Sequence, residues 1–318
     1  MKPNLTRRSS HSLTADRSRR SALHTLAHAA WAGSVMLGAG WPVLSRASPV
    51  PSRSGAAPRL ITVGGGITEV VYALGVQDQL VATDTTSSYP SAAQATLKVG
   101  YMRQLSAEGI LALRPSALVA GTDAGPPVVL DQLRSAGVKV ELVESDHSWE
   151  EVRRKVAAVG RATGRVQQAT VLQAELDARW AAVRQRVQQQ ISAKPPRVLF
   201  VLSHTGAPLV SGEATAAHAM IGFVGARNAM GGFKGYRPMT AEAMAAAAPD
   251  LILITNEGLA AVGGAEKFWQ RPELAVTPAF HRRMQAQTLL HLDALELLGF
   301  GPRLPQVVQR LHQTVVAA

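Results

Sequence analysis

The sequence predicts an α/β fold of two similar lobes with mainly parallel sheets, joined by one long helix. Three observations predict it. Short β-branched runs alternate with helix-like stretches in both halves of the 318-residue chain, which is typical of parallel sheets. The two halves share a weak internal repeat. Between the halves, apolar residues recur at helical spacing, as expected for an amphipathic helix.

The first 47 residues have the three-part composition of an export signal. They hold seven basic residues and one acidic residue, so they supply more than half of the net charge of +11. An apolar run at 22–44 follows the Arg19-Arg20 pair, and small residues precede a cleavage point expected near Ala47. The paired arginines suggest the twin-arginine route. A transmembrane anchor is the alternative, which the histidines, glycines and proline of the run disfavour.

Composition also limits the classes of function. The chain has no cysteine, which excludes thiol catalysis, disulfides, iron–sulfur ligation and a lipid-bearing N-terminal cysteine. Because the basic excess lies mainly in the leader, we expect no nucleic-acid partner. We therefore expect a soluble periplasmic protein after signal cleavage.

The N-terminal lobe is expected over residues 48–165, after a flexible start at 48–57 that is rich in Pro and Ser. The glycines at 64–66 are expected to form the turn between the first strand and the first helix. The expected strands lie at 60–63, 80–83, 117–120 and 138–143, and the expected helices at 67–74, 106–113 and 128–135.

An interlobe helix is expected over 166–193, from a stripe of apolar residues at steps of four, four, three, four and four. At 1.5 Å per residue, a helix from about 167 to 192 would span roughly 40 Å, enough to cross from lobe to lobe. A coiled-coil segment is the alternative, although the repeat covers fewer than four heptads. The stripe is Leu172, Leu176, Trp180, Val183, Val187 and Ile191.

The C-terminal lobe is expected over 194–318, beginning with a strand at 197–202. The internal repeat relates the two lobes. In the first, Gly100-Tyr101 leads to Ser106-Ala107-Glu108 and then to an apolar run. In the second, Gly235-Tyr236 leads to Thr240-Ala241-Glu242 and another apolar run. The repeat indicates two lobes of similar construction.

We predict no catalytic residue. The glycines at 64–66 and Asp84 resemble a dinucleotide-binding fingerprint, but Glu69 stands at the third glycine position, where its carboxylate would repel a pyrophosphate. Phosphate-loop, zinc-protease and serine-hydrolase motifs are absent, and no close histidine pair points to zinc. An exported α/β enzyme is nevertheless kept as an alternative class.

Tyr101 is the first candidate binding residue. It lies between the end of a strand segment and a helix start at Ser106, and such connections line the ligand crevice of open α/β sheets. A phenol is normally protonated, with a pKa near 10. Ferric iron would stabilise the phenolate, and Arg103 could add positive charge. A surface or half-buried tyrosine without a ligand is the alternative.

Three further candidates lie in the second lobe. His204 follows the strand at 197–202, where cleft residues project, although a structural histidine is the alternative. Tyr236 and Arg237 repeat the Gly-Tyr-Arg chemistry of the first lobe. The guanidinium groups of Arg103 and Arg237 could hold carboxylates or could be solvated.

Residues 58–315 resemble the periplasmic haem-binding proteins of bacterial ABC haem importers, in the class that includes cobalamin- and siderophore-binding proteins. The most family-specific block is Gly100-Tyr101-Met102-Arg103. The other blocks that carry the resemblance lie at 61–69, 104–109, 198–204, 262–264, 274–279 and 298–305.

This resemblance implies a ligand cleft between the lobes and a function in transport without catalysis. Tyr101 would be the axial ligand of a ferric haem b, with Arg103 stabilising the phenolate or a propionate. His204 matches a histidine that contacts a second stacked haem in some members, so one haem or two would bind. The same fold binding a ferric siderophore or cobalamin is the alternative.

The resemblance also implies the partners. They would be an ABC haem permease and its ATPase, so the protein would meet the membrane only through the permease. Glu108 and Glu242 occupy the places where this class presents one acid per lobe to permease arginines. The alternative is that each glutamate only stabilises the start of its helix.

Overall fold

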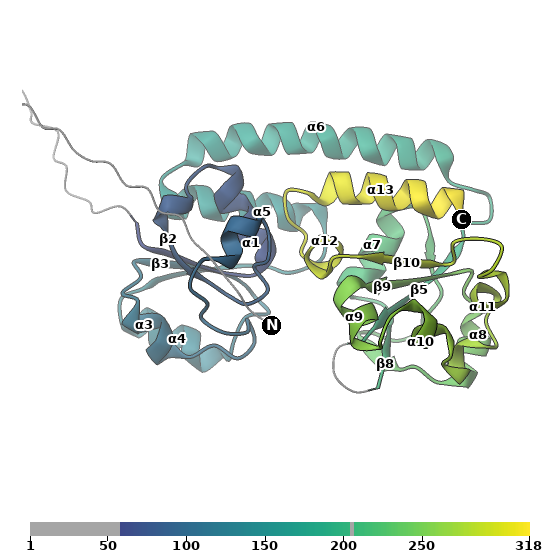
Figure 1. The fold of residues 1–318 in the computed structure, drawn as a ribbon. Coiled ribbons are helices and arrows are strands. Elements are labelled where there is room, and N and C mark those ends of the chain that lie inside the picture. Colours follow the sequence, from purple (N-terminus) through teal and green to yellow (C-terminus); the bar gives the residue numbers. More distant parts are fainter. Residues whose placement is uncertain (1–57, 204–206) are drawn as a thin grey trace, which may run out of the picture. The chain divides into compact units, whose positions relative to one another are not determined.

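The computed structural model describes residues 58–203 and 207–318 (Figure 1). The predicted export signal at 1–47 and flexible start at 48–57 lie outside the described residues. Within the described ranges, no helix is long and apolar enough to cross a membrane.

The N-terminal lobe is built on a parallel four-stranded sheet with the order β2-β1-β3-β4. Each strand lies within one residue of its predicted bounds. The two central strands are buried along their whole length and are nearly continuous apolar runs, as is usual for parallel strands. The strands are β1 (Leu60–Val63), β2 (Leu80–Thr83), β3 (Ala117–Gly121) and β4 (Lys139–Val143). The helices are α1 (Gly65–Ala73), the 3-10 turn η1 (Gln77–Gln79), α2 (Ser91–Gln94), α3 (Ala107–Ala112), α4 (Pro127–Ser135) and α5 (Trp149–Thr163).

The start of α1 differs from the prediction of a three-glycine turn followed by a helix at 67. Only Gly64 turns the chain, with φ of 109°, and the helix already includes Gly65 and Gly66. A Cβ atom on Gly66 would overlap the carbonyl oxygen of Gly299 in the other lobe. These two glycines therefore serve close packing rather than backbone freedom.

The C-terminal lobe holds a mixed sheet with the order β10-β9-β5-β6-β8, with β7 also paired to β5. The prediction of parallel strands holds for β10, β9, β5 and β7, whereas β6 pairs antiparallel with both β5 and β8. Too few residues separate β5 from β6 for a parallel crossover, which needs about a dozen or more.

The strands of this lobe are β5 (Arg197–Leu202), β6 (Leu209–Ser211), β7 (Arg227–Asn228), β8 (Tyr236–Pro238), β9 (Leu251–Thr255) and β10 (Leu289–Leu292). The helices are α7 (Ala216–Phe223), α8 (Ala241–Ala247), α9 (Asn256–Ala261), α10 (Ala265–Trp269), the 3-10 turn η2 (Pro272–Leu274), α11 (Pro278–Arg282), α12 (Ala294–Leu298) and α13 (Leu304–Ala317).

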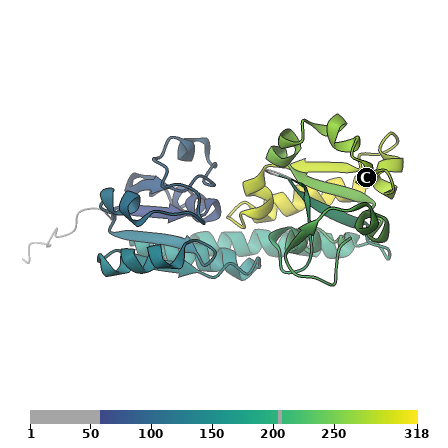
Figure 2. The same ribbon diagram turned by 90° about the horizontal axis from the view of Figure 1, so that it is seen from below.

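Helix α6 (Val166–Gln190) runs along both lobes, packing on α5 of the first and α13 of the second (Figures 1 and 2). Of the predicted apolar stripe, Leu176, Val183 and Val187 are buried, whereas Ile191 caps the helix and is exposed. The rings of Trp180 and Trp149 stack at 4.8 Å, which joins α6 to α5.

One apolar core passes through both lobes. It includes Leu60 and Val152 of the N-terminal lobe, Leu176 of α6, and Phe200 and Val308 of the C-terminal lobe. Each lobe also has a smaller core of its own. Because the largest core is shared, the two lobes are held in one arrangement by burial as well as by the helix.

Candidate functional site

A cavity of about 620 Å³ lies between the two lobes. The N-terminal lobe contributes the ends of β1 and β3, the first turn of α1 and the loops after β2 and β4. The C-terminal lobe contributes 214–216, the start of β8 and 294–299. The carboxyl ends of parallel strands meet at one sheet edge, which explains why loops far apart in sequence meet here. The volume is in the range of about 300–1,000 Å³ that is usual for small-molecule sites.

The wall of this cleft has an apolar part and a polar part. The apolar side chains are Ile67, Met102, Ala216, Leu295 and Leu298. The polar side chains include Arg103, Asp123, Ser145, His147 and Tyr236. Apolar surface with a few placed polar groups is the usual composition of a site for an organic ligand.

Tyr101 begins a tight turn at the edge of the cleft. The N–H of Gln104 donates to the carbonyl of Tyr101 at 2.8 Å, and the N–H of Gly125 donates to the carbonyl of Met102 at 2.9 Å. Met102 and Arg103 line the cavity, whereas Tyr101, directly before them in the chain, is not among the lining residues and has 43 % of its surface exposed. The predicted pair Tyr101 and Arg103 therefore lies on one fixed turn beside the cleft.

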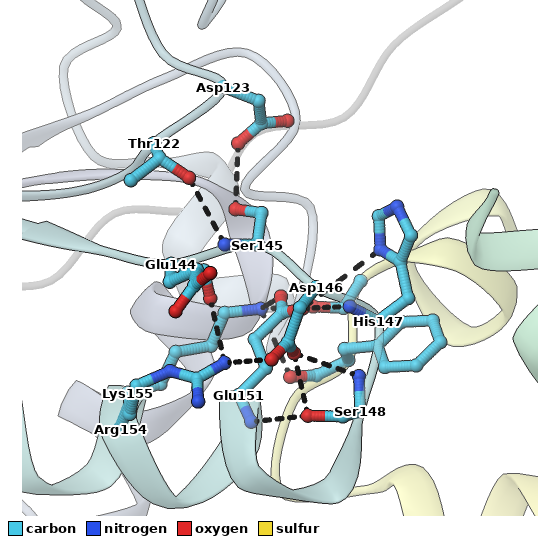
Figure 3. A network of polar contacts seen from close by, with 12 residues as sticks. Thr122, Asp123, Glu144, Ser145, Asp146, His147, Ser148, Glu151, Arg154 and Lys155 are labelled. Atoms are coloured by element: carbon cyan, nitrogen blue, oxygen red, sulfur yellow. Dashed lines mark hydrogen bonds and ion pairs between the residues drawn. The ribbon is translucent and has the colours of Figure 1, made fainter. Parts of the chain in front are cut away.

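Arg103 is paired with Asp123, an acid that no sequence motif marks. Its guanidinium lies 3.5 Å from the carboxylate of Asp123, which also accepts a hydrogen bond of 3.0 Å from the Ser145 hydroxyl (Figure 3). Asp123 follows β3 and Ser145 follows β4, so both come from the carboxyl edge of the sheet. Position after a strand is the signal that could have identified them.

Tyr236 lines the same cavity from the other lobe, at the start of β8. Burial raises the pKa of the Tyr236 phenol, and the positive charge of Arg103 partly opposes this. Arg103 and Tyr236 therefore line the same cavity from opposite lobes. Arg237 does not line the cavity, because its guanidinium packs over the Phe233 ring at 4.4 Å. His204 lies outside the described residues.

A polar network joins the loop after β4 to the opposite lobe (Figure 3). The backbone N–H of His147 donates to Glu151 at 2.7 Å, and the same carboxylate pairs with Lys155 at 2.6 Å. The Lys155 ammonium also donates to the carbonyls of Gly299 and Phe300 at 2.9 and 3.1 Å. The base of the cleft is thus fixed by charge-assisted hydrogen bonds between the lobes.

Glu69 takes part in a second contact between the lobes. Both of its carboxylate oxygens accept hydrogen bonds from Arg303, at 2.7 and 3.0 Å. Burial raises the pKa of Glu69, and the charge and hydrogen bonds of Arg303 oppose this rise. Glu69 therefore has a structural partner 234 residues away.

A larger groove of about 920 Å³ lies beside this ion pair, between 88–94 and the β10–α13 side of the second lobe. Its two arginines, Arg303 and Arg310, are both paired with Glu296. The cleft is lined by two of the predicted residues, Arg103 and Tyr236, and the groove by none of those that the structure describes, so we place the candidate site in the cleft.

Glu108 and Glu242 occupy equivalent positions in the two lobes. Each lies in the first turn of its helix, α3 or α8, after an N-cap Ser106 or Thr240. Both glutamates are exposed. Hydrogen bonds from its own backbone and from Thr240 lower the pKa of Glu242. In Figure 1, α3 and α8 lie on the side of the lobes away from α6.

Two α/β lobes that share a core and a long helix, with a cleft at the strand ends, define the substrate-binding proteins of bacterial importers. Residues 60–283 match the periplasmic binding protein family, and the chain belongs to that family. The resemblance inferred from the sequence is therefore confirmed at the level of the family, and with it the two-lobed fold.

Two solved structures similar to this chain are those of periplasmic haem-binding proteins. The periplasmic haem-binding protein BhuT, in complex with two haems, is 46 % identical, with a TM-score of 0.77 over 82 % of this chain and 98 % of BhuT. The periplasmic haem-binding protein RhuT from Roseiflexus sp. RS-1 is 35 % identical, with the same TM-score, over 83 % of this chain and 100 % of RhuT.

A vitamin B12-binding protein is similar to this chain at lower sequence identity. The vitamin B12-binding protein of Photorhabdus laumondii is 25 % identical over 261 residues, which cover 81 % of this chain and 88 % of that protein. The family as a whole thus includes binding proteins for haem and for cobalamin.

Proposed function

We propose that the protein is a periplasmic haem-binding protein that delivers ferric haem to an ABC transporter permease for iron uptake. The observation that carries this proposal is the Gly-Tyr-Met-Arg turn at the cleft, in a chain 46 % identical to BhuT. The mixed apolar and polar wall fits a porphyrin, whose ring is apolar and whose propionates are charged.

Each residue of the turn has a distinct role in this proposal. The Tyr101 oxygen binds the ferric iron as phenolate, because a bound cation favours the charged form of a phenol. Arg103 supplies positive charge beside it, either to the phenolate or to a propionate, and Asp123 holds the guanidinium in place. Met102 lines the cavity and offers apolar contact to the ring.

The opposite lobe supplies the remaining contacts. Tyr236 faces the ligand across the cleft, whereas Arg237, one residue further along β8, packs over Phe233 and does not line the cavity. His204 is the proposed contact for a second haem, and the number of haems is one or two. No catalysed reaction is part of the proposal, because the work of such a protein is binding and release.

Cobalamin or a ferric siderophore is the second candidate ligand, supported by the relative from Photorhabdus laumondii. These ligands carry a metal that is already coordinated, so they do not need an axial tyrosine. The position of Tyr101 beside Arg103 at the cleft therefore favours haem.

The proposal is tested by titrating the purified protein with haemin, cyanocobalamin and a ferric siderophore in parallel. Haem in the cleft should quench the tryptophan fluorescence of the stacked Trp149 and Trp180 pair and shift the Soret band. We expect saturable binding of haemin alone, at one or two haems per chain. Tight binding of cobalamin or siderophore, with no Soret shift for haemin, would reject haem as the ligand.

A further inference from the structure

Tyr101 is carried by a segment that extends the edge of the first sheet. The N–H of Thr83, the last residue of β2, donates to the carbonyl of Leu97 at 2.8 Å, and the N–H of Val99 donates to Thr83 at 2.9 Å. The N–H of Thr85 donates to the carbonyl of Gly100 at 3.0 Å. Because β2 is an edge strand, residues 97–100 add a short parallel partner to it and end directly before Tyr101.

Lys98 ties this segment to its neighbours. Its ammonium donates to the Thr83 hydroxyl at 2.7 Å and to the carbonyls of Ser87 and Ala93 at 2.9 and 3.0 Å. An ammonium has three hydrogens, and all three are used. The acceptors lie at the end of β2, in the turn that follows it and in α2, so one side chain joins three pieces of chain to the tyrosine segment.

Asp84 binds the turn after β2 and the start of α1 through its buried carboxylate. Its carboxylate is fully buried and accepts hydrogen bonds from the N–H groups of Gly64 and Thr86, both at 2.9 Å, and from the Ser87 hydroxyl at 2.7 Å. Gly64 and Thr86 themselves line the cleft. The acid therefore fixes the cleft wall from behind without entering the cavity.

Lys98 and Asp84 carry opposite charges that interact. Burial lowers the pKa of the Lys98 ammonium, and the negative charge of Asp84 partly opposes this shift. Both charged groups bond to Ser87, Asp84 to its hydroxyl and Lys98 to its carbonyl. A buried carboxylate needs hydrogen bonds and a nearby opposite charge. Gly64, Thr86 and Ser87 supply the hydrogen bonds to Asp84, and Lys98 supplies the positive charge.

We propose that Asp84 and Lys98 are positioning residues that set the direction and rigidity of the phenol of Tyr101. Neither side chain lines the cavity, so they act through the segment at 97–100 and the turn at 84–87. The inference rests on the proposed iron ligation by Tyr101. Outer residues that orient a metal ligand typically change metal affinity by about 10–100-fold when they are replaced.

The test uses Lys98→Met, which removes the charge and the three hydrogen bonds but keeps most of the aliphatic stem. Lys139→Met, at the exposed start of β4, is the matched control with the same loss of charge. The rate of haem release is measured as the rate of haem transfer to excess apomyoglobin. We expect release about tenfold faster in Lys98→Met, with a broadened ferric–phenolate signal, and no change in Lys139→Met.

A double-mutant cycle separates positioning from general stability. In a Tyr101→Phe background, the Lys98→Met change should no longer alter the release rate, because the ligand it orients is gone. An equal change in both backgrounds, or wild-type release and signal in Lys98→Met, would overturn the inference. Failure of the wild type itself to bind haemin would instead reject the proposed function.

Discussion

At the scale of single residues, the charges between the lobes are the features that the sequence could not reveal. Glu69 and Arg303 are 234 residues apart, and no local pattern relates them. Glu69 stands where a dinucleotide fingerprint has its third glycine, and its carboxylate is buried against Arg303. By contrast, the proximity of Tyr101 to Arg103 is local, because the two residues lie in one turn.

Removal of Arg303 should therefore be costly. Arg303→Met leaves the Glu69 carboxylate buried without its partner, and we expect a loss of about 3–5 kcal/mol in the free energy of unfolding. The control is Arg310→Met, which removes an exposed arginine paired with Glu296 and should cost less than about 1 kcal/mol. Urea unfolding measures both, and equal losses would contradict this account of Glu69.

The free energy of unfolding of Arg303→Met should also depend on pH. Arg303 opposes the burial that raises the pKa of Glu69, so its loss raises that pKa further. The folded form then binds the proton more tightly than the unfolded chain, and stability falls as the pH rises through the folded pKa. We expect the deficit of Arg303→Met to shrink between about pH 8 and about pH 5. If Arg303→Met is less stable than the wild type by the same amount over this whole range, the proposed protonation of Glu69 is wrong.

At the scale of elements, the strands of the first sheet and the first strand of the second sheet were predictable, and the antiparallel part of the second sheet was not. Strands β1, β2 and β5 have the predicted bounds, because each is a short run of apolar and β-branched residues. The short strands β6 and β8 hold three residues each and give no such run. Their pairing depends on a tight connection after β5, which the sequence pattern does not show.

The first turn of α1 gives a prediction at this scale. A methyl group on Gly66 would overlap the backbone carbonyl of Gly299, and backbone cannot move aside as a flexible side chain does. We expect Gly66→Ala to destabilise the protein by about 1–3 kcal/mol, as overpacking does, and to weaken haem binding. The measurement is thermal unfolding with a haemin titration.

Gly109→Ala is the matched control for that experiment. Gly109 lies in α3, and the nearest atoms to a new methyl group would be those of Ser106 at about 3.9 Å. Alanine is the better helix former by about 1 kcal/mol, so this variant should be as stable as the wild type or more so. If both variants lose stability equally, close packing of α1 against the other lobe is not the cause.

At the scale of the whole molecule, the internal repeat places one exposed acid in each lobe. Glu108 and Glu242 follow equivalent N-caps, and both helices lie away from α6 (Figure 1). Their relation was predictable from sequence because each N-cap motif is local. The polar residues Asp123, His147 and Glu151 were missed because only folding brings the loops after β3 and β4 to the cleft.

We expect Glu108→Lys combined with Glu242→Lys to abolish haem-dependent growth while leaving haemin affinity unchanged, because charge reversal repels permease arginines without touching the cleft. The control reverses two exposed acids elsewhere, Glu175 on α6 and Glu266 on α10. Growth equal to that of the wild type in the first double variant would refute the docking role.

The most direct measurement of the central claim is a resonance Raman spectrum of the haemin complex of the wild type, Tyr101→Phe and Tyr72→Phe. Tyr72 is half buried within α1 and lies outside the turn that borders the cleft, so its variant controls for loss of one hydroxyl. We predict ferric–phenolate vibrations in the wild type and in Tyr72→Phe, and their disappearance in Tyr101→Phe. Phenolate vibrations that persist in Tyr101→Phe would contradict the account.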